Sequence, residues 1–125
     1  MSKRDLGTWG ETKVEQYLKE KGYEILVRGY QTRQGEIDLI AKKPPYLAFV
    51  EVKLRKDNQF ASAMESVTRA KQKKIILAAL SYLMESGMQQ ELQPRFDVAE
   101  VYAPLGEKTV QPEIFYLENA FAAET

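Results

Sequence analysis

The hydrophobic pattern begins with an amphipathic helix over residues 5–21. Val14, Tyr17 and Leu18 recur at a spacing that places them on one face of a helix. Gly22 follows this stripe, and a glycine often ends a helix. The sequence therefore predicts a helix that packs one side against a larger core.

A second helix is predicted from Thr68 to about Ser86. Threonine is a good N-terminal capping residue, and Gly87 stands where a C-terminal cap is expected. The apolar positions of this helix are Ile75, Ile76, Ala79, Leu80 and Leu83. Residues 57–67, which precede it, are predicted to form a loop or a short helical turn.

Between and after these helices, hydrophobic and polar residues follow strand patterns. The predicted strands are residues 23–30, 36–41, 46–54 and 95–102, with a weaker fifth at 114–117. Residues 42–45 form so short a link that the strands on either side are expected to make an antiparallel hairpin. The final residues, 118–125, are predicted to be a short helix or a loose tail. The order αβββαβ(β) predicts an α/β fold with a sheet flanked by helices.

Composition narrows the chemistry that is open to this chain. With 125 residues, of which 44% are hydrophobic, it is long enough for one domain with its own core. It has no cysteine and no histidine, which excludes disulfides, thiolate metal sites and serine–histidine triads. Carboxylates, lysines, hydroxyls or a hard metal ion must carry any reaction. The polar start MSKRDLGTWGE predicts no signal peptide, and we expect a cytoplasmic protein.

The net charge is zero, but the charges are unevenly distributed. Residues 53–74 carry seven basic side chains against two acidic ones, and residues 91–125 carry seven acidic side chains against two basic ones. A local basic field attracts a phosphate backbone even when the whole chain is neutral. Charge alone does not separate this interpretation from a solvated helix surface followed by an acidic tail.

The alternation of side chains predicts two faces for the hairpin. In its first strand, one predicted face holds Glu36, Asp38 and Ile40. The opposite face holds Ile37, Leu39 and Ala41. In its second strand, one predicted face holds Phe49, Glu51, Lys53 and Arg55. Each strand is therefore expected to have a side that turns polar toward the same end of the hairpin.

The hairpin is also predicted to bring two carboxylates together. If it folds between its two prolines, Asp38 lies opposite Glu51, and Glu36 lies opposite Lys53. Directly opposed Cβ atoms are about 4.5–5.5 Å apart, and two carboxylates at that distance repel unless a cation lies between them. Hard oxygen ligands suit Mg²⁺ or Mn²⁺. The pair of Glu36 and Lys53 alone is more typical of a solvated salt bridge.

A third carboxylate comes from the first helix. Glu11 lies three and seven residues before Val14 and Leu18, so it points with the apolar stripe toward the core. A glutamate there is costly unless it is paired or binds something. From periodicity alone, Glu11 is equally well a boundary residue of the helix. Gly7 and Gly10 beside it permit close packing or mark a frayed start.

These residues resemble the motif of a known superfamily. The stretches GEIDLIA and FVEVKLR resemble the PD-(D/E)xK nuclease motif, with Ile37 in place of the proline before Asp38. A glutamate on the first helix is similar to a feature of archaeal-type Holliday-junction resolvases. Together with SVTRAKQKKI and RFDV, these stretches resemble the YraN family of small bacterial proteins over about residues 6–102. The resemblance implies a restriction-endonuclease-like mixed sheet in one domain, 1–125, with an acidic extension at 103–125.

The resemblance also implies the roles of individual residues. Glu11, Asp38, Glu51 and the Val52 carbonyl would bind one Mg²⁺ or Mn²⁺ ion. Asp38, Glu51 and Lys53 would be catalytic, and Glu36 would support Lys53 from outside the set of metal ligands. The residues expected to grip a DNA backbone are Arg55, Lys56, Arg69, Lys71 and Lys74.

The expected activity is metal-dependent phosphodiester hydrolysis of DNA. Selectivity is expected for branched or flapped DNA, because phosphate contacts carry no sequence information. Two alternatives stay open: a nucleic-acid-binding module that does not cut, and a protein-interaction domain on the same fold. The resolvase-like relatives leave a homodimer open, and no membrane partner is expected.

Overall fold

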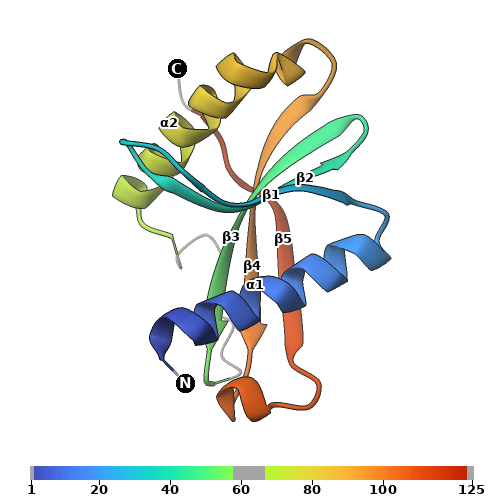
Figure 1. The fold of residues 1–125 in the computed structure, drawn as a ribbon, viewed down its shortest axis with the longest axis vertical. Helices are drawn as coiled ribbons and strands as arrows, with labels where there is room; N and C mark the ends of the chain where they lie inside the picture. Colours follow the sequence, from blue (N-terminus) through green and yellow to red (C-terminus); the bar gives the residue numbers. More distant parts are fainter. Residues whose placement is uncertain (1, 58–66, 124–125) are drawn as a thin grey trace.

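The computed structural model describes residues 2–57 and 67–123. The elements along the chain are α1 (Lys3–Glu20), β1 (Glu24–Gln31), β2 (Glu36–Lys43), β3 (Tyr46–Arg55), α2 (Arg69–Ser86), η1 (Met88–Gln90), β4 (Gln93–Tyr102), η2 (Gly106–Lys108) and β5 (Glu113–Phe121) (Figure 1). This order confirms the prediction for helices and strands. Most of the predicted loop at 57–67 lies outside the described residues.

Local capping explains where the two long helices begin and end. α1 starts earlier than predicted because the Ser2 side chain accepts the backbone N–H of Asp5, and the Asp5 side chain bonds back to Ser2. α2 starts after Thr68, whose side chain accepts the N–H of Lys71 at 3.2 Å. It ends at Gly87, which adopts the left-handed conformation with φ of 70°. In the described part of the chain, neither helix is long and apolar enough to cross a membrane.

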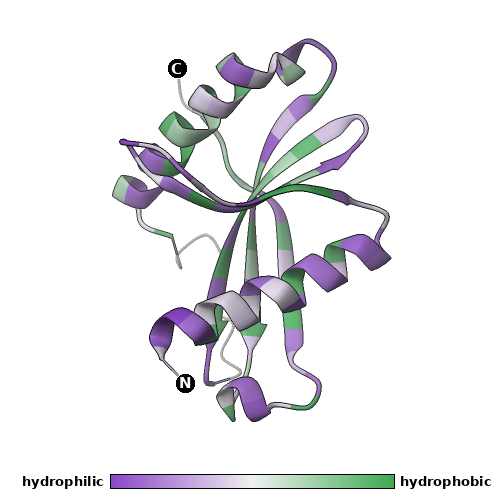
Figure 2. Cartoon of the chain, in the orientation of Figure 1, coloured by the Kyte–Doolittle hydropathy of each residue, from purple (hydrophilic) through white to green (hydrophobic). Residues whose placement is uncertain are grey.

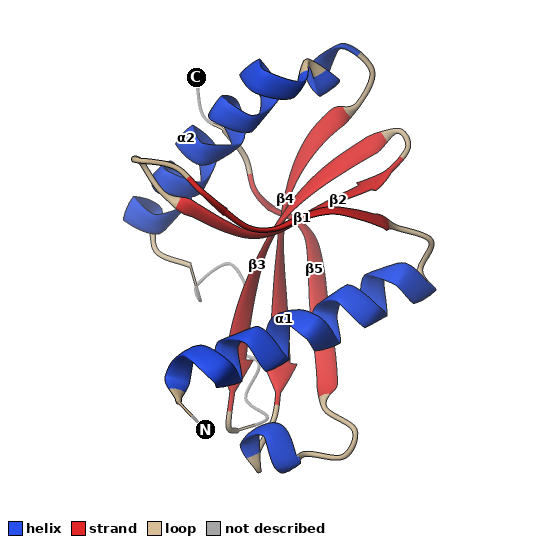
Figure 3. Cartoon of the chain, viewed as in Figure 1, coloured by secondary structure: helices blue, strands red, loops and turns tan. Residues whose placement is uncertain are grey.

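The five strands form one mixed sheet in the order β1-β2-β3-β4-β5. β3 and β4 are parallel, and the other neighbouring pairs are antiparallel. A parallel pair needs a crossover connection, and α2 lies within the one between β3 and β4. Figure 3 shows the two long helices at opposite sides of the strands. The predicted restriction-endonuclease-like α/β fold is confirmed.

The C-terminal part of the chain is more regular than predicted. Residues 118–121 belong to β5, so the prediction of a helix or loose tail is wrong for them. The side chain of Asp97 explains the irregular pairing here. Its Oδ1 accepts the backbone N–H of Asn119 at 2.9 Å, and Asn119 has φ of 55° where the β4–β5 register shifts.

Asp97 is also the centre of a buried polar network. Its carboxylate accepts bonds from Arg95 at 2.8 to 3.1 Å and from the Tyr116 hydroxyl, and Arg95 bonds in turn to the Tyr23 hydroxyl. Asp97 is fully buried, and Arg95 is almost so. Buried charges need such pairing to offset their desolvation. The network ties β4 and β5 to Tyr23, the residue directly before β1.

Each face of the sheet carries its own hydrophobic core. α1 covers one face, where it packs on the strand residues Leu39, Ala41, Ala48, Val50, Ala99 and Val101. α2 covers the other face, where it packs on Ile37, Ile40, Leu47, Phe49, Phe96 and Val98. Figure 2 shows hydrophobic residues in the strands and along α2, whereas α1 is mostly hydrophilic. The polar residues where β2 and β3 part form the site described next.

Candidate functional site

Asp38 and Glu51 come together where β2 and β3 begin to part. The strands pair in the predicted register, and the last pair of the ladder is Leu39 with Val50. One residue further, Asp38 Oδ2 accepts the backbone N–H of Val52 at 2.8 Å. The Asp38 carboxylate lies within hydrogen-bonding reach of the Glu51 carboxyl group. The predicted register is confirmed, and the two acidic groups meet.

The alternation of side chains between the two faces of the sheet is interrupted in β2 at Asp38. Ile37 packs with Ile40 on the α2 side of the sheet, whereas Leu39 packs on the α1 side. The predicted strict alternation, with Ile37 beside Leu39, is therefore wrong at this point. Gly29 of β1 lies opposite Asp38 and has φ of 64°, a conformation that side chains disfavour. This irregular step accompanies the end of the β2–β3 ladder and leaves the Asp38 side chain available to Val52.

The far half of the β1–β2 hairpin rests on α2. The Tyr30 hydroxyl donates to the side chains of Ser81 at 3.4 Å and Glu85 at 3.3 Å. At the turn, Gly35 is so close to α2 that a Cβ atom there would lie 2.7 Å from the backbone oxygen of Lys74. The β1–β2 hairpin is thus packed against α2, the helix that also carries Lys71.

The electrostatics of the Asp38–Glu51 pair favour the binding of a positive charge. Glu51 is only 6% exposed. Burial raises the pKa of Glu51 from 4.5 to about 8, and hydrogen bonding to Asp38 and its negative charge act in the same direction. Lys71 and Lys53 lower this pKa, and the Lys71 Nζ lies 3.9 Å from Glu51 Oε2. A cation beside the two carboxylates would favour the charged form of Glu51 and remove their repulsion.

Glu11 approaches the pair from α1. Gly10 permits this approach, because a Cβ atom at Gly10 would lie 3.1 Å from the Leu54 side chain on β3. Burial raises the pKa of Glu11 to about 7, and the charges of Asp38 and Glu36 add to this effect, while Arg28 opposes it. Glu11 therefore lies in the electrostatic field of Asp38, on the side of α1 that faces the sheet.

The three acidic side chains do not form a complete metal cage. Across residues 2–57 and 67–123, no group of three aspartate or glutamate side chains lies close enough together to hold a metal ion. The Asp38–Glu51 pair nevertheless fits a hard divalent cation, because it brings together carboxylate oxygens whose mutual repulsion a cation would remove. Glu11 would have to come closer to join them. The Val52 N–H is already used in holding Asp38.

The remaining strand residues of the predicted site are Lys53, Arg55 and Glu36. Lys53 lies on β3, near enough to lower the pKa of Glu51. Arg55 is held through its Nε by Glu100 of β4 at 2.7 Å. Glu36 pairs with Gln31 of β1 instead of facing Lys53, because the β2–β3 ladder has already ended. It contributes to the site through its charge on Glu11.

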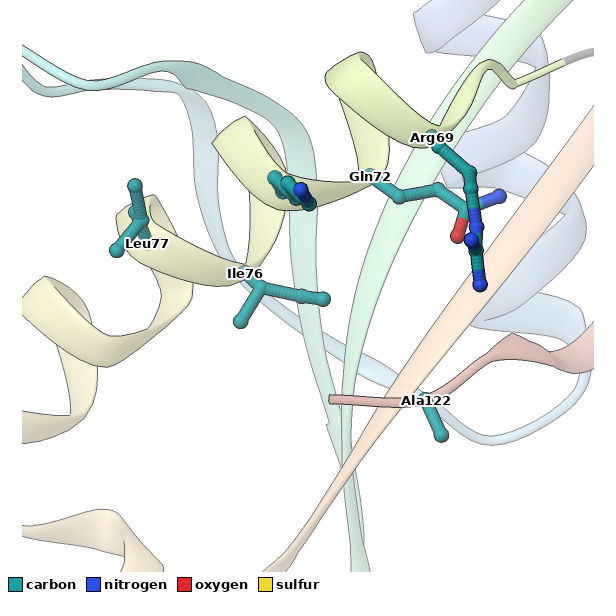
Figure 4. A pocket seen from close by; sticks show the side chains of 6 residues that line it. Arg69, Gln72, Ile76, Leu77 and Ala122 are labelled. Carbon is teal, nitrogen blue, oxygen red and sulfur yellow. The ribbon is translucent and has the colours of Figure 1, made fainter. Parts of the chain in front are cut away.

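The predicted DNA-binding residues of α2 point to different surroundings. Lys71 faces Glu51, and Lys74 lines a hollow at the hairpin turn together with Glu36. Arg69 lies on another side of α2. Figure 4 shows it at a pocket of about 350 Å³ between α2 and Ala122, whose other lining residues are Gln72, Lys73, Ile76 and Leu77. Lys56 is exposed beyond the end of β3.

Sequence reasoning missed one residue beside the site. Glu100 is fully buried, although it belongs to a strand that was predicted correctly in outline. The signal was present in the alternation of β4, where Glu100 shares its face with Phe96 and Val98 of the α2-side core. A glutamate in such a position is costly unless it has a partner, and its partner is Arg55.

The fold and the paired carboxylates define the class of this protein: a restriction-endonuclease-like α/β domain with an acidic pair at the parting of β2 and β3. Comparison of sequences then gives the family. Residues 10–101 match the sequence model of Uncharacterised protein family UPF0102, and the chain belongs to this family, which is the YraN family.

Individual relatives match along nearly their whole length. A UPF0102 protein of Caldicellulosiruptor saccharolyticus is 38% identical over 121 residues, which cover 97% of this chain and 100% of the relative. One from Saccharophagus degradans is 42% identical over 117 residues, covering 94% and 92%. One from Caldanaerobacter subterraneus subsp. tengcongensis is 40% identical over 121 residues, covering 97% and 98%. The matched region contains every candidate site residue.

Proposed function

We propose that this protein is a nuclease that hydrolyses phosphodiester bonds of DNA with the help of Mg²⁺ or Mn²⁺. The observation that carries the proposal is the buried Glu51 carboxyl group in contact with the half-buried Asp38 carboxylate, beside Lys53. A buried glutamate and a half-buried aspartate in hydrogen-bonding contact are a poor arrangement for stability alone. They are a good arrangement for a divalent cation, which supplies Lewis acidity toward a phosphoryl oxygen and a water molecule.

The residues of the chain have distinct roles in this proposal. Asp38 and Glu51 would hold the cation, and the Val52 carbonyl and Glu11, once it has moved closer, would complete the protein ligands. The Val52 N–H fixes the orientation of Asp38, so it sets the geometry of the pair. Lys53 stabilises the negative charge that develops on the phosphate. Lys71 faces Glu51 from α2 and neutralises part of the acidic field that would otherwise repel a phosphate.

The proposed substrate is branched or flapped DNA. Lys53 and Lys71 lie near Glu51, and the other cations of β3 and α2 lie further out. Such cations suit contacts with phosphates, which carry no base information. Arg69 and Lys74 lie on different sides of α2. Cations spread in this way suit a substrate with more than one backbone direction, and this supports selectivity for shape.

The proposal is tested by cleavage of labelled branched and linear DNA with Mg²⁺, Mn²⁺ or a chelator. We expect wild-type protein to cut the branched substrate only with the metal. Asp38→Asn keeps the size of the side chain but removes its charge, and we expect a loss of at least about 100-fold, the typical size of a charge-stabilisation effect at a reacting centre. Glu24→Gln, at an exposed position of β1, is the matched control and should cut normally. Equal cleavage by wild type and Asp38→Asn would end the proposal.

A second candidate is a nucleic-acid-binding module that does not cut. The observation that favours it is that the described residues hold no ready-made group of three metal ligands. Such a module would bind DNA with a steep salt dependence but would take up no Mn²⁺ through Asp38 and Glu51. Calorimetric titration with Mn²⁺ separates the two candidates. DNA binding that is absent at any salt concentration would instead leave a protein-interaction domain.

A further inference from the structure

Glu100 is a buried charge that the hydrophobic core does not need. It is fully buried on β4, and its Oε2 accepts the Arg55 Nε–H at 2.7 Å. Its other oxygen, Oε1, has no hydrogen-bond partner among the described residues. An unsatisfied buried oxygen of a charged group is expensive, and an apolar residue of similar size would usually be at least as stable. The stability of the fold alone therefore does not account for this residue.

The other buried carboxylate of β4 shows what a purely structural solution looks like. Asp97 also binds an arginine, but its two oxygens are fully used by Arg95, Tyr116 and the N–H of Asn119. Glu100 lies three residues away on the same strand and keeps one oxygen open. The two glutamate oxygens are thus unequal, and the open one remains to be explained.

The sheet register shows what lies next to the open oxygen. β3 and β4 are parallel, and Lys53 is the register partner of Glu100. Residues with alternating positions share a face, so Glu51, Lys53 and Arg55 follow Phe49 on the α2 side, where Glu100 follows Val98. Glu100 therefore borders both cations of β3, directly beyond the carboxylate pair.

We propose that Glu100 is a positioning residue that holds Lys53 and Arg55 side by side as one phosphate-binding unit. This inference rests on the proposed function and adds to it a second part of the same site. Oε2 fixes the guanidinium of Arg55, and the open Oε1 would accept the Lys53 ammonium group when a phosphate draws the two cations together. An anchored pair of cations loses less side-chain freedom on binding a phosphate than two mobile chains do. Glu100 itself touches no substrate.

The direction in which DNA affinity changes when Glu100 is removed separates the positioning role from a simple effect of net charge. Removing a negative charge near a phosphate site should strengthen DNA binding if only the net field matters. If Glu100 positions the two cations, its removal should weaken binding even though the protein becomes more positive. Glu118→Gln is the charge-matched control. Glu118 is an exposed carboxylate 3.7 Å from Arg95, at the opposite end of β4 from Glu100.

The experiment measures fluorescence anisotropy of labelled branched DNA with Ca²⁺, at several salt concentrations, for wild type, Glu100→Gln and Glu118→Gln. We expect Glu100→Gln to bind about 10-fold more weakly, the effect of losing one or two well-placed charged hydrogen bonds. The slope of log affinity against log salt should fall by about 1 to 2, because about 0.9 is lost per phosphate contact. Glu118→Gln should bind as wild type does or slightly more tightly.

A second variant keeps the test decisive if Glu100→Gln does not fold, which circular dichroism and thermal unfolding would show. Glu100→Asp keeps the charge but withdraws the carboxylate by one methylene, and it should also weaken binding and reduce the salt slope. Binding by a folded Glu100 variant that equals or exceeds that of wild type overturns the inference.

The outcomes also separate this inference from the proposed function. If wild-type protein binds DNA but does not cut it, and Glu100→Gln binds DNA more weakly, then cleavage is refuted and the positioning role is supported. Wild type that cuts, with Glu100→Gln binding normally, refutes the positioning role alone. Wild type that binds no DNA refutes both.

Discussion

Replacing Glu51 with glutamine should stabilise the metal-free protein at neutral pH. The pKa of Glu51 is about 8 in the folded protein, against an ordinary value of 4.5. When folding raises the pKa of a carboxyl group, the folded state is favoured below the unfolded pKa and loses that advantage as the pH rises. The cost of Glu51 is therefore absent below about pH 4.5 and grows until about pH 8.

The size of this effect follows from the two pKa values. From pH 4.5 to about pH 7, roughly 2.5 pH units at about 1.4 kcal/mol each set an upper limit of about 3.5 kcal/mol. Part of this cost comes from the neighbouring Asp38 and does not belong to Glu51 alone, so we expect a gain of about 1–3 kcal/mol in the free energy of unfolding. Glutamine keeps the side-chain size and carries no charge.

Urea unfolding in the presence of a chelator measures this gain. Wild type, Glu51→Gln and the exposed control Glu24→Gln are compared at about pH 4 and about pH 7. The variant should exceed wild type at the higher pH only, and the control should follow wild type at both. A Glu51→Gln protein that is no more stable than wild type at neutral pH, or that gains equally in acid, would refute the reasoning.

Two further substitutions test the framework around the site, both by urea unfolding. Gly35→Ala should lower the free energy of unfolding by about 1–3 kcal/mol, because its Cβ atom would lie 2.7 Å from the Lys74 backbone oxygen. Gly7→Ala is the control and should cost nothing, because nothing lies within 4 Å of a Cβ atom there. Equal effects of the two substitutions would contradict the close approach of Gly35 to α2. Asp97→Asn should cost about 3–5 kcal/mol, because it leaves the buried Arg95 without its counter-charge. A loss below about 1 kcal/mol would mean that the network contributes little.

The sequence was sufficient for the parts of the site that depend on regular geometry. The short link between β2 and β3 and the period of two along each strand placed Asp38 opposite Glu51, and the register agrees. The helical period likewise turned Glu11 toward the sheet, where its raised pKa shows the influence of Asp38. In both cases local rules and tertiary packing favour the same arrangement.

The errors occur where a single backbone irregularity overrides the regular pattern. Nothing in the alternation of β2 indicated that Ile37 would change face, because the accompanying irregular step is a left-handed glycine on the neighbouring strand, Gly29. The extended β5 was missed because Asn119 interrupts it with positive φ, which the contact with Asp97 stabilises across strands. Such contacts join residues far apart in sequence, so no local pattern reports them.

Glu100 was missed for a different reason. Its neighbours predict a buried strand, and the sequence does show an acidic residue on the buried face. Its significance depends on the parallel pairing of β3 with β4, which brings it beside Lys53 and Arg55. Parallel pairs lie at either end of a long crossover, so their register cannot be counted from a short turn as it can for a hairpin.

The central claim is that Asp38 and Glu51 share a divalent cation. Anomalous diffraction from a crystal of the wild-type protein soaked in Mn²⁺ tests it most directly. The predicted result is one strong peak bonded to oxygens of both carboxylates, and no such peak in Asp38→Asn. A wild-type map with both side chains well ordered and no peak between them would contradict the claim.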